Sequence, residues 1–236
     1  MKVRTIDYEA DGLQLTGTLA VPDTPGPHPA VLIGHEGPGL DDVQRNRASE
    51  IAELGYIGFA LEYHGELSPF AERDVMMQRL DELGNDPDRT RRLARAALDV
   101  VLDQPEVDPT RIAAIGYCFG ATVALELGRS GADLKAIAGF HPGLGNVRPD
   151  DSANITGRVL MCIGADDPLI PIEHRASFEA EMRNAGVAAD MIIYGGVVHS
   201  FTHPMATSAG IPGIAYDQRA AAHSWLAMRQ LLTEIF

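Results

Sequence analysis

The sequence predicts an α/β protein whose mostly parallel β-sheet is covered by helices on both faces. Short apolar runs recur along the chain, and segments with helical spacing separate most of the later runs. The first two runs alternate between apolar and polar residues, which favours a hairpin. Continuous apolar runs of this length are typical of parallel strands that are buried on both faces. We therefore expect a doubly wound sheet of about eight strands that begins with a hairpin.

The individual elements follow from local signals along the chain. Asp11-Gly12 joins the first two runs and is a common hairpin dipeptide. Gly55, Gly128 and Gly186 close segments in which apolar residues recur every three or four positions. We expect strands at residues 3–10, 13–22, 30–35, 56–63, 111–117, 134–141, 158–165 and 189–196. We expect helices at residues 41–54, 88–102, 119–127, 173–185 and about 214–235.

The segment 64–90 is more polar and less regular than its surroundings. Two interpretations stay open for it. It could cover a pocket at the end of the sheet. It could also form a surface helix whose Met76, Met77 and Leu80 face the core.

Length, charge and cysteine content limit the classes of function. The 236 residues contain no linker, so we expect a single domain at residues 1–236. The net charge of −14 argues against nucleic acid and anionic membranes as partners. No apolar run reaches the roughly 18 residues of a spanning helix. The acidic start of the chain favours the cytoplasm, where neither Cys118 nor Cys162 is expected to form a disulfide.

The stretch Gly116-Tyr117-Cys118-Phe119-Gly120 lies between an expected strand and an expected helix. Gly-x-Ser-x-Gly in this context forms a nucleophile elbow, a strained turn on which glycines leave room for the neighbouring strand and helix. The helix N-terminus would lower the pKa of the Cys118 thiol below its usual value of about 8.5. The alternative is an inert buried cysteine.

The residues that follow two later strands could serve such a nucleophile. On this architecture, an acid and then a histidine are expected after the nucleophile, each just beyond a strand. Asp166 and Asp167 follow the strand at 158–165, and His199 follows the strand at 189–196. Taken singly, an aspartate could hold a turn or cap a helix, and the histidine could bind backbone. The order of all three predicts a catalytic triad.

The motifs "HEG", "GYCFGA", "GADDPLIP" and "VVHSF" resemble those of the dienelactone hydrolase family, in the α/β-hydrolase superfamily, from about residue 31 to 201. The resemblance implies the α/β-hydrolase fold and selects Asp167, four residues before Pro171, as the acid. It also implies that Glu36 holds the resting thiol, although Glu36 could equally cap the helix that begins near Asp41. Backbone N–H groups of Phe119 and, by resemblance, Gly37 would bind the oxyanion.

The chain departs from the family at the arginines that hold a substrate carboxylate. His203 stands where one arginine is expected, and Tyr63-His64-Gly65 where another would follow the fourth strand. We therefore expect a neutral or weakly anionic ester substrate, unless Arg73 or Arg79 replaces the missing charge. The candidate substrate-binding residues are Tyr63, His64, Phe70, Arg73, Met76 and His203.

A cysteine nucleophile also restricts the leaving group. A thiolate, with a conjugate-acid pKa of about 8.5, leaves more readily than an alkyl alkoxide, whereas phenols with a pKa of about 10 compete with it. We therefore expect activity on activated esters or lactones with aryl or enol leaving groups, without cofactor or metal. The overall pattern is also similar to a phosphotriester-hydrolysing member of the family. The alternatives are a metal-dependent hydrolase that uses His199 and His203, and a non-catalytic binding protein.

Overall fold

The computed structural model describes residues 1–65, 68–69 and 72–236, and its strands form one eight-stranded sheet. The strands lie in the order β1-β2-β4-β3-β5-β6-β7-β8. The first two pairs, β1 with β2 and β2 with β4, are antiparallel, and every later pair is parallel. The predicted fold class and strand number are therefore confirmed. The strands are β1 (Lys2–Ala10), β2 (Leu13–Val21), β3 (His28–Gly34), β4 (Ile57–Leu61), β5 (Val107–Tyr117), β6 (Ala136–Phe140), β7 (Arg158–Gly164) and β8 (Ala189–Tyr194).

The hairpin forms where its turn dipeptide predicts it. Strands β1 and β2 pair in continuous register from Lys2 with Val21 to Ala10 with Leu13. Asp11 and Gly12 at the turn both have positive φ, 52° and 75°. Aspartate and glycine accept this backbone conformation at low cost, so the two residues fix the register of the sheet edge.

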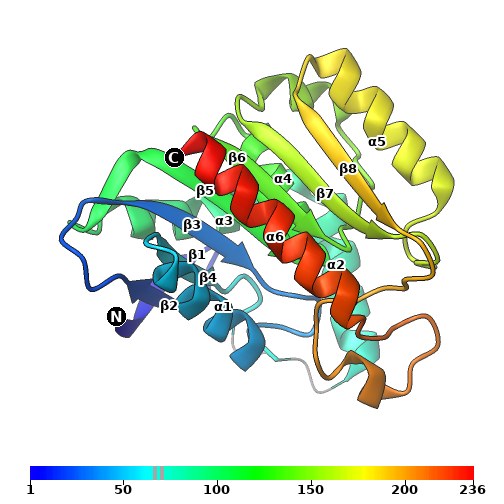
Figure 1. Cartoon of the computed structure of the whole chain (residues 1–236), viewed down its shortest axis with the longest axis horizontal. Helices are drawn as coiled ribbons and strands as arrows, with labels where there is room; N and C mark the ends of the chain where they lie inside the picture. Colours follow the sequence, from blue (N-terminus) through cyan, green and yellow to red (C-terminus); the bar gives the residue numbers. More distant parts are fainter. Residues whose placement is uncertain (66–67, 70–71) are drawn as a thin grey trace.

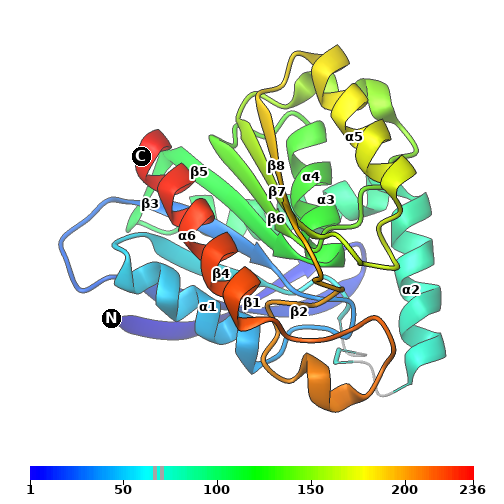
Figure 2. The same cartoon turned by 45° about the vertical axis from the view of Figure 1, so that its right-hand side comes forward.

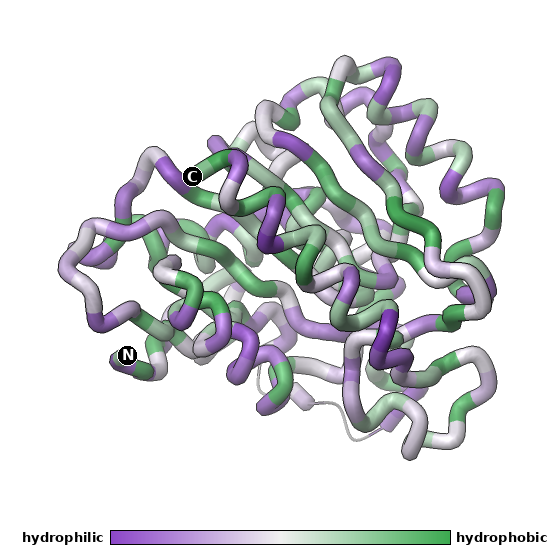
Figure 3. The backbone as a smooth tube through the Cα atoms, in the orientation of Figure 1, coloured by the Kyte–Doolittle hydropathy of each residue, from purple (hydrophilic) through white to green (hydrophobic). Residues whose placement is uncertain are grey.

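Helices cover both faces of the sheet (Figures 1 and 2). Apolar residues of α1 (Asp42–Glu53) and α6 (Gln218–Ile235) pack against one face. Those of α3 (Pro87–Leu102), α4 (Phe119–Arg129) and α5 (Ile172–Ala185) pack against the other. Helix α2 (Arg73–Asn85) packs on α3. Two short 3-10 helices lie at Pro149–Asn154 and Ala206–Ala209. Figure 3 shows the apolar strands enclosed by more polar helices, as the sequence pattern predicts.

The last helix starts later than its sequence pattern suggests. It begins at Gln218, not near Ile214, because the Asp217 carboxylate accepts a hydrogen bond from Ala220 N and caps it there. Ile214 instead pairs with His199 in an isolated parallel bridge. The residues before α6 therefore pair with the loop that carries His199.

The polar segment 64–90 contains a helix, α2. Met76 and Leu80 of this helix are partly buried, whereas Met77 is 43% exposed. The prediction that Met77 faces the core is therefore wrong. Phe70 lies outside the described residues.

Both cysteines are free, as predicted. No helix in the described part of the chain has the length and apolar character needed to cross a membrane. The single domain and the cytoplasmic location stay predictions.

Candidate active site

The candidate site lies at the carboxyl ends of the parallel strands. Glu36 follows β3, Cys118 follows β5, Asp167 follows β7 and His199 follows β8. Strand order places β3 beside β5, so the segments after these two strands leave the sheet next to each other. Ligands of open α/β sheets bind in the crevice outside the carboxyl ends of the strands.

Cys118 lies on a strained turn between β5 and α4. Its φ is 51°, which is unusual for a residue with a side chain, and its N–H donates to Phe140 O at 2.9 Å. A Cβ on Gly116 would lie 2.1 Å from Gly120 O, and one on Gly120 would lie 2.3 Å from Gly34 C. Glycine is required at both positions because backbone fills the space. This is the strand-turn-helix arrangement that the sequence predicts.

A continuous chain of hydrogen bonds joins Cys118, His199 and Asp167. His199 Nε2 lies 3.2 Å from Cys118 Sγ, and His199 Nδ1 lies 2.7 Å from Asp167 Oδ2. Both Asp167 and His199 are buried, whereas Asp166 is exposed. The other oxygen of Asp167 accepts from Leu169 N at 2.9 Å, so the same carboxylate also holds its turn.

The charges of the residues on either side of His199 favour its protonated form. Burial by itself lowers the pKa of His199. The negative charge of a Cys118 thiolate and the hydrogen bond with Asp167 outweigh burial, and they raise the pKa of His199 to about 10. With a thiolate beside it, His199 therefore stays protonated at neutral pH. At Cys162, in contrast, burial raises the pKa of the thiol to about 12 and keeps it protonated.

Glu36 is buried next to the triad but bonds elsewhere. Its Oε2 accepts from Ser200 Oγ at 3.1 Å, and its Oε1 lies 3.6 Å from His141 Nε2. Burial raises the pKa of its carboxyl. The cap of α1 is Asp41, which accepts from Val43 N at 2.8 Å, so the alternative of a Glu36 cap is wrong. The Cys118 sulfur faces His199, and a role for Glu36 in holding the thiol stays a prediction.

Sequence reasoning missed His141, which supports the ring of His199. It directly follows β6 with a positive φ of 41° and is fully buried. Its ring meets that of His199 edge-on, with centroids 5.0 Å apart, and its Nε2 lies 2.8 Å from Thr202 Oγ1. Burial holds the pKa of His141 well below its usual range, so it adds no charge beside the imidazolium. His199 is predicted because it follows a strand, and His141 also follows a strand, so the same signal could have identified it.

Two of the predicted substrate-binding residues are buried behind the Glu36–Gly37 turn. The Tyr63 hydroxyl donates to His35 O at 2.7 Å, and His64 Nε2 donates to Gly37 O at 3.0 Å. Burial lowers the pKa of His64 to about 2, so its ring is neutral. These contacts place Tyr63 and His64 in support of the turn.

The remaining predicted substrate-binding residues lie nearer to solvent. His203 Nε2 donates to Asp41 Oδ2 at 3.1 Å, and this bond raises the pKa of His203. Arg73 is exposed at the start of α2. Met76 is half-buried, with its sulfur 3.6 Å from the point that a Cβ on Gly37 would occupy. Substrate contacts for all of these residues stay predictions.

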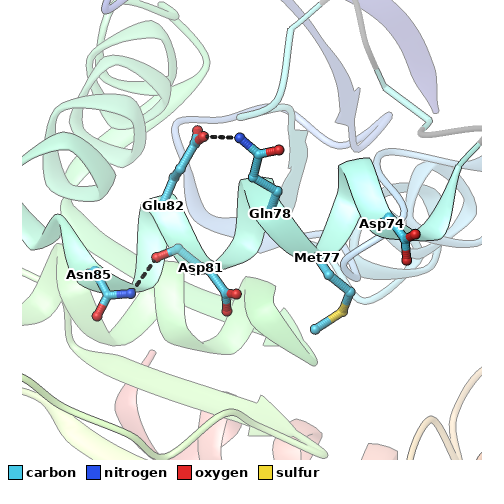
Figure 4. A pocket seen from close by; sticks show the side chains of 6 residues that line it. All are labelled: Asp74, Met77, Gln78, Asp81, Glu82 and Asn85. Carbon is cyan, nitrogen blue, oxygen red and sulfur yellow. Dashed lines mark hydrogen bonds between the residues drawn. The ribbon is translucent and has the colours of Figure 1, made fainter.

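The outer face of α2 carries a shallow hollow of about 580 Å³ (Figure 4). Its polar groups bond along the helix, with Gln78 Nε2 donating to Glu82 Oε1 at 3.0 Å and Asn85 Nδ2 to Asp81 O at 2.8 Å. None of the triad residues lines it. Within the ranges that the structure describes, no group of three or more His, Cys, Asp or Glu side chains is placed to hold a metal ion.

Comparison with known proteins identifies relatives over almost the whole chain. A solved structure named m3DLH is 43% identical, with a TM-score of 0.96, and the match covers 100% of this chain and 98% of that one. A dienelactone hydrolase-like promiscuous phosphotriesterase from metagenomic libraries is 39% identical over the same shares, with a TM-score of 0.94. A Synechocystis sp. protein named carboxymethylenebutenolidase is 24% identical over 98% of this chain and 96% of its own length.

The family model for the dienelactone hydrolase family matches residues 15–236. This match includes most of β2 and every element from β3 to α6, and with them all of the strand ends that carry the candidate site. The non-catalytic alternative is therefore wrong, since the chain is a hydrolase. The chain belongs to the dienelactone hydrolase family.

Proposed function

We propose that this hydrolase cleaves activated esters and lactones with a Cys118-His199-Asp167 triad and without a metal ion. The observation that carries the proposal is the unbroken path from the Cys118 sulfur through His199 to the Asp167 carboxylate, with separations of 3.2 and 2.7 Å. The same arrangement of a nucleophile, a histidine and a group that orients the histidine serves hydrolysis on unrelated folds.

The reaction begins with the thiolate of Cys118, which attacks the ester carbonyl. The sulfur–carbon bond forms, the carbonyl oxygen becomes an oxyanion, and the N–H groups of Phe119 and Gly37 stabilise it by roughly 3 kcal/mol per donor. Phe119 begins α4, so its N–H has no acceptor within the helix. The alcohol leaves with a proton from His199. Water, deprotonated by His199, then releases the acid from the thioester, while Asp167 stabilises each imidazolium.

The rate should depend strongly on the leaving group. In the tetrahedral intermediate, thiolate and alkoxide compete to leave, and an ethoxide loses to a thiolate with a conjugate-acid pKa of about 8.5. We expect 4-nitrophenyl acetate and enol lactones to turn over at least about 100-fold faster than ethyl acetate, a difference of roughly 3 kcal/mol in the barrier. Values of kcat/KM for a series of acetate esters measure this. Comparable rates for ethyl and nitrophenyl esters would contradict a thiolate nucleophile.

The surroundings of the triad favour a neutral or weakly anionic substrate. His203 occupies the position of a family arginine, but its ring nitrogen is held by the Asp41 carboxylate. The pair carries no net positive charge when His203 is protonated. It therefore offers little attraction to a substrate carboxylate, which supports the preference that the missing arginines suggest.

A second activity, hydrolysis of phosphotriesters, is supported by the 39% identical phosphotriesterase. The Cys118 thiolate would attack phosphorus, a phenolate would leave, and water would then cleave the sulfur–phosphorus bond of the phospho-enzyme. We expect continuous release of 4-nitrophenol from paraoxon, well beyond one equivalent per enzyme. A single equivalent followed by permanent inactivation would show that the phospho-enzyme is not hydrolysed, and would reject this second activity.

A further inference from the structure

Three consecutive backbone carbonyls after β3 are each held by a buried aromatic side chain. The Tyr63 hydroxyl donates to His35 O at 2.7 Å, His35 Nδ1 to Glu36 O at 2.7 Å, and His64 Nε2 to Gly37 O at 3.0 Å. All three side chains are at most 2% exposed. Buried polar groups are costly unless bonded, so this cluster of His35, Tyr63 and His64 specifies one conformation of the turn.

The cluster is itself rigid. The rings of His35 and Tyr63 stack with centroids 3.8 Å apart at an angle of 8°, and the rings of His35 and His64 lie 4.9 Å apart. The buried Glu62 carboxylate accepts from the N–H groups of His64 and Gly65 at 2.6 and 2.7 Å. It also lies 3.6 Å from His35 Nε2. The stacked ring of Tyr63 and the bond from Nδ1 to Glu36 O thus fix the plane of the His35 ring.

The bond from His35 acts on the peptide group that contains Gly37 N–H. A trans peptide is planar, and its C=O and N–H point in opposite directions. The carbonyl of Glu36 accepts from His35 Nδ1 and also from Gly39 N, at 3.1 Å. Two donors on this carbonyl set the direction of the N–H on the other side of the same plane. They also polarise the amide, which makes its N–H a stronger donor.

This turn lies beside the nucleophile. Gly34 at the end of β3 pairs with Gly116 of the elbow strand. A Cβ on Gly120, two residues after Cys118, would lie 2.5 Å from His35 O, and the ring of Tyr63 is 6.1 Å from that of Phe119. The cluster therefore packs against both the turn that contains Gly37 and the start of α4 at Phe119, the two segments that would supply the oxyanion donors.

We propose that His35 is a positioning residue, which aims the Gly37 N–H at the oxyanion by holding the carbonyl of the same peptide. The proposal rests on the proposed function, because the use of Gly37 N–H belongs to that mechanism. It assigns to His35 no contact with substrate. Its effect should appear only in steps that develop negative charge on oxygen.

The test compares two reactions of Cys118. Acylation by 4-nitrophenyl acetate forms an oxyanion, whereas alkylation by iodoacetamide forms a sulfur–carbon bond and releases iodide without one. His35→Phe keeps a ring on Tyr63 but removes the donor. We expect kcat/KM of His35→Phe for the ester to fall about 10-fold or more. This is smaller than the roughly 10²- to 10³-fold loss that follows complete removal of one oxyanion donor, because the Gly37 N–H is misdirected but still present. The rate of alkylation should equal that of the parent protein. His35→Asn, whose amide nitrogen replaces Nδ1, should restore most of the ester rate.

A matched control is His28→Phe at the other end of β3, where His28 Nε2 lies 2.9 Å from Thr24 O. Both of its rates should stay parental. A folded His35→Phe with a parental ester rate would overturn the proposal, and so would an equal fall in both rates. If His35→Phe does not fold, His35→Leu makes the same comparison. Failure of the proposed function is seen separately, in ester hydrolysis that survives Cys118→Ala.

Discussion

Cys118→Ala is expected to lower kcat/KM for 4-nitrophenyl acetate by roughly 10⁴-fold or more, the scale on which loss of a triad nucleophile acts. The loss should be this large because the variant retains His199, Asp167 and the oxyanion donors but has no group that can form the acyl intermediate. The side chain is partly exposed on its turn, so its removal creates only a small cavity. Steady-state rates with aryl esters, lactones and paraoxon, together with a thermal melt, make the measurement.

Cys162→Ala is the matched control. Its sulfur is buried in β7, where burial raises the pKa of the thiol to about 12, and we expect parental rates from this variant. Iodoacetamide should inactivate the parent and Cys162→Ala alike, while EDTA should leave both active. Unchanged activity of Cys118→Ala would remove the triad from the mechanism. Loss of activity in EDTA would favour the metal-dependent alternative.

The sequence predicts most of the fold because the signals are local. Apolar runs, glycine stops and the Asp11-Gly12 turn depend on neighbouring residues, and the structure has the eight strands and the hairpin that they indicate. The start of α6 differs because Ile214 pairs with His199, a contact between distant segments that periodicity cannot contain. Met77 is exposed on α2, which packs on α3, and periodicity within the helix cannot show which neighbour the helix packs against.

The candidate site is predictable where chemistry and strand ends coincide. Cys118, Asp167 and His199 each follow a strand, so order along the chain is sufficient to propose that they meet. Supporting contacts are harder to predict, because they depend on how loops fold back. His141 and His35 also follow strands, but nothing in the sequence shows that one lies against His199 and the other bonds the next carbonyl. The pairing of His203 with Asp41 joins residues 162 positions apart.

Asp167→Asn is expected to lower kcat for ester hydrolysis by roughly 10³-fold or more, because the amide can donate to His199 Nδ1 and favours the wrong tautomer. It should also change the pH dependence. Burial lowers the pKa of His199, but the Cys118 thiolate and the Asp167 bond raise it to about 10. Without the carboxylate this pKa falls, so His199 loses its proton at lower pH. The alkaline limb of the kcat/KM profile should therefore move from near pH 10 in the parent to lower pH in the variant.

Asp166→Asn provides the control for charge, since it removes a neighbouring carboxylate that is exposed. An effect of net charge alone would shift both profiles by similar amounts, whereas a specific bond to His199 predicts a shift only for Asp167→Asn. An Asp167→Asn variant that kept both the rate and the alkaline limb of the parent would show that the 2.7 Å contact does not control His199. The role of Asp167 would then be limited to stabilising the turn in which it lies, through the hydrogen bond from Leu169 N.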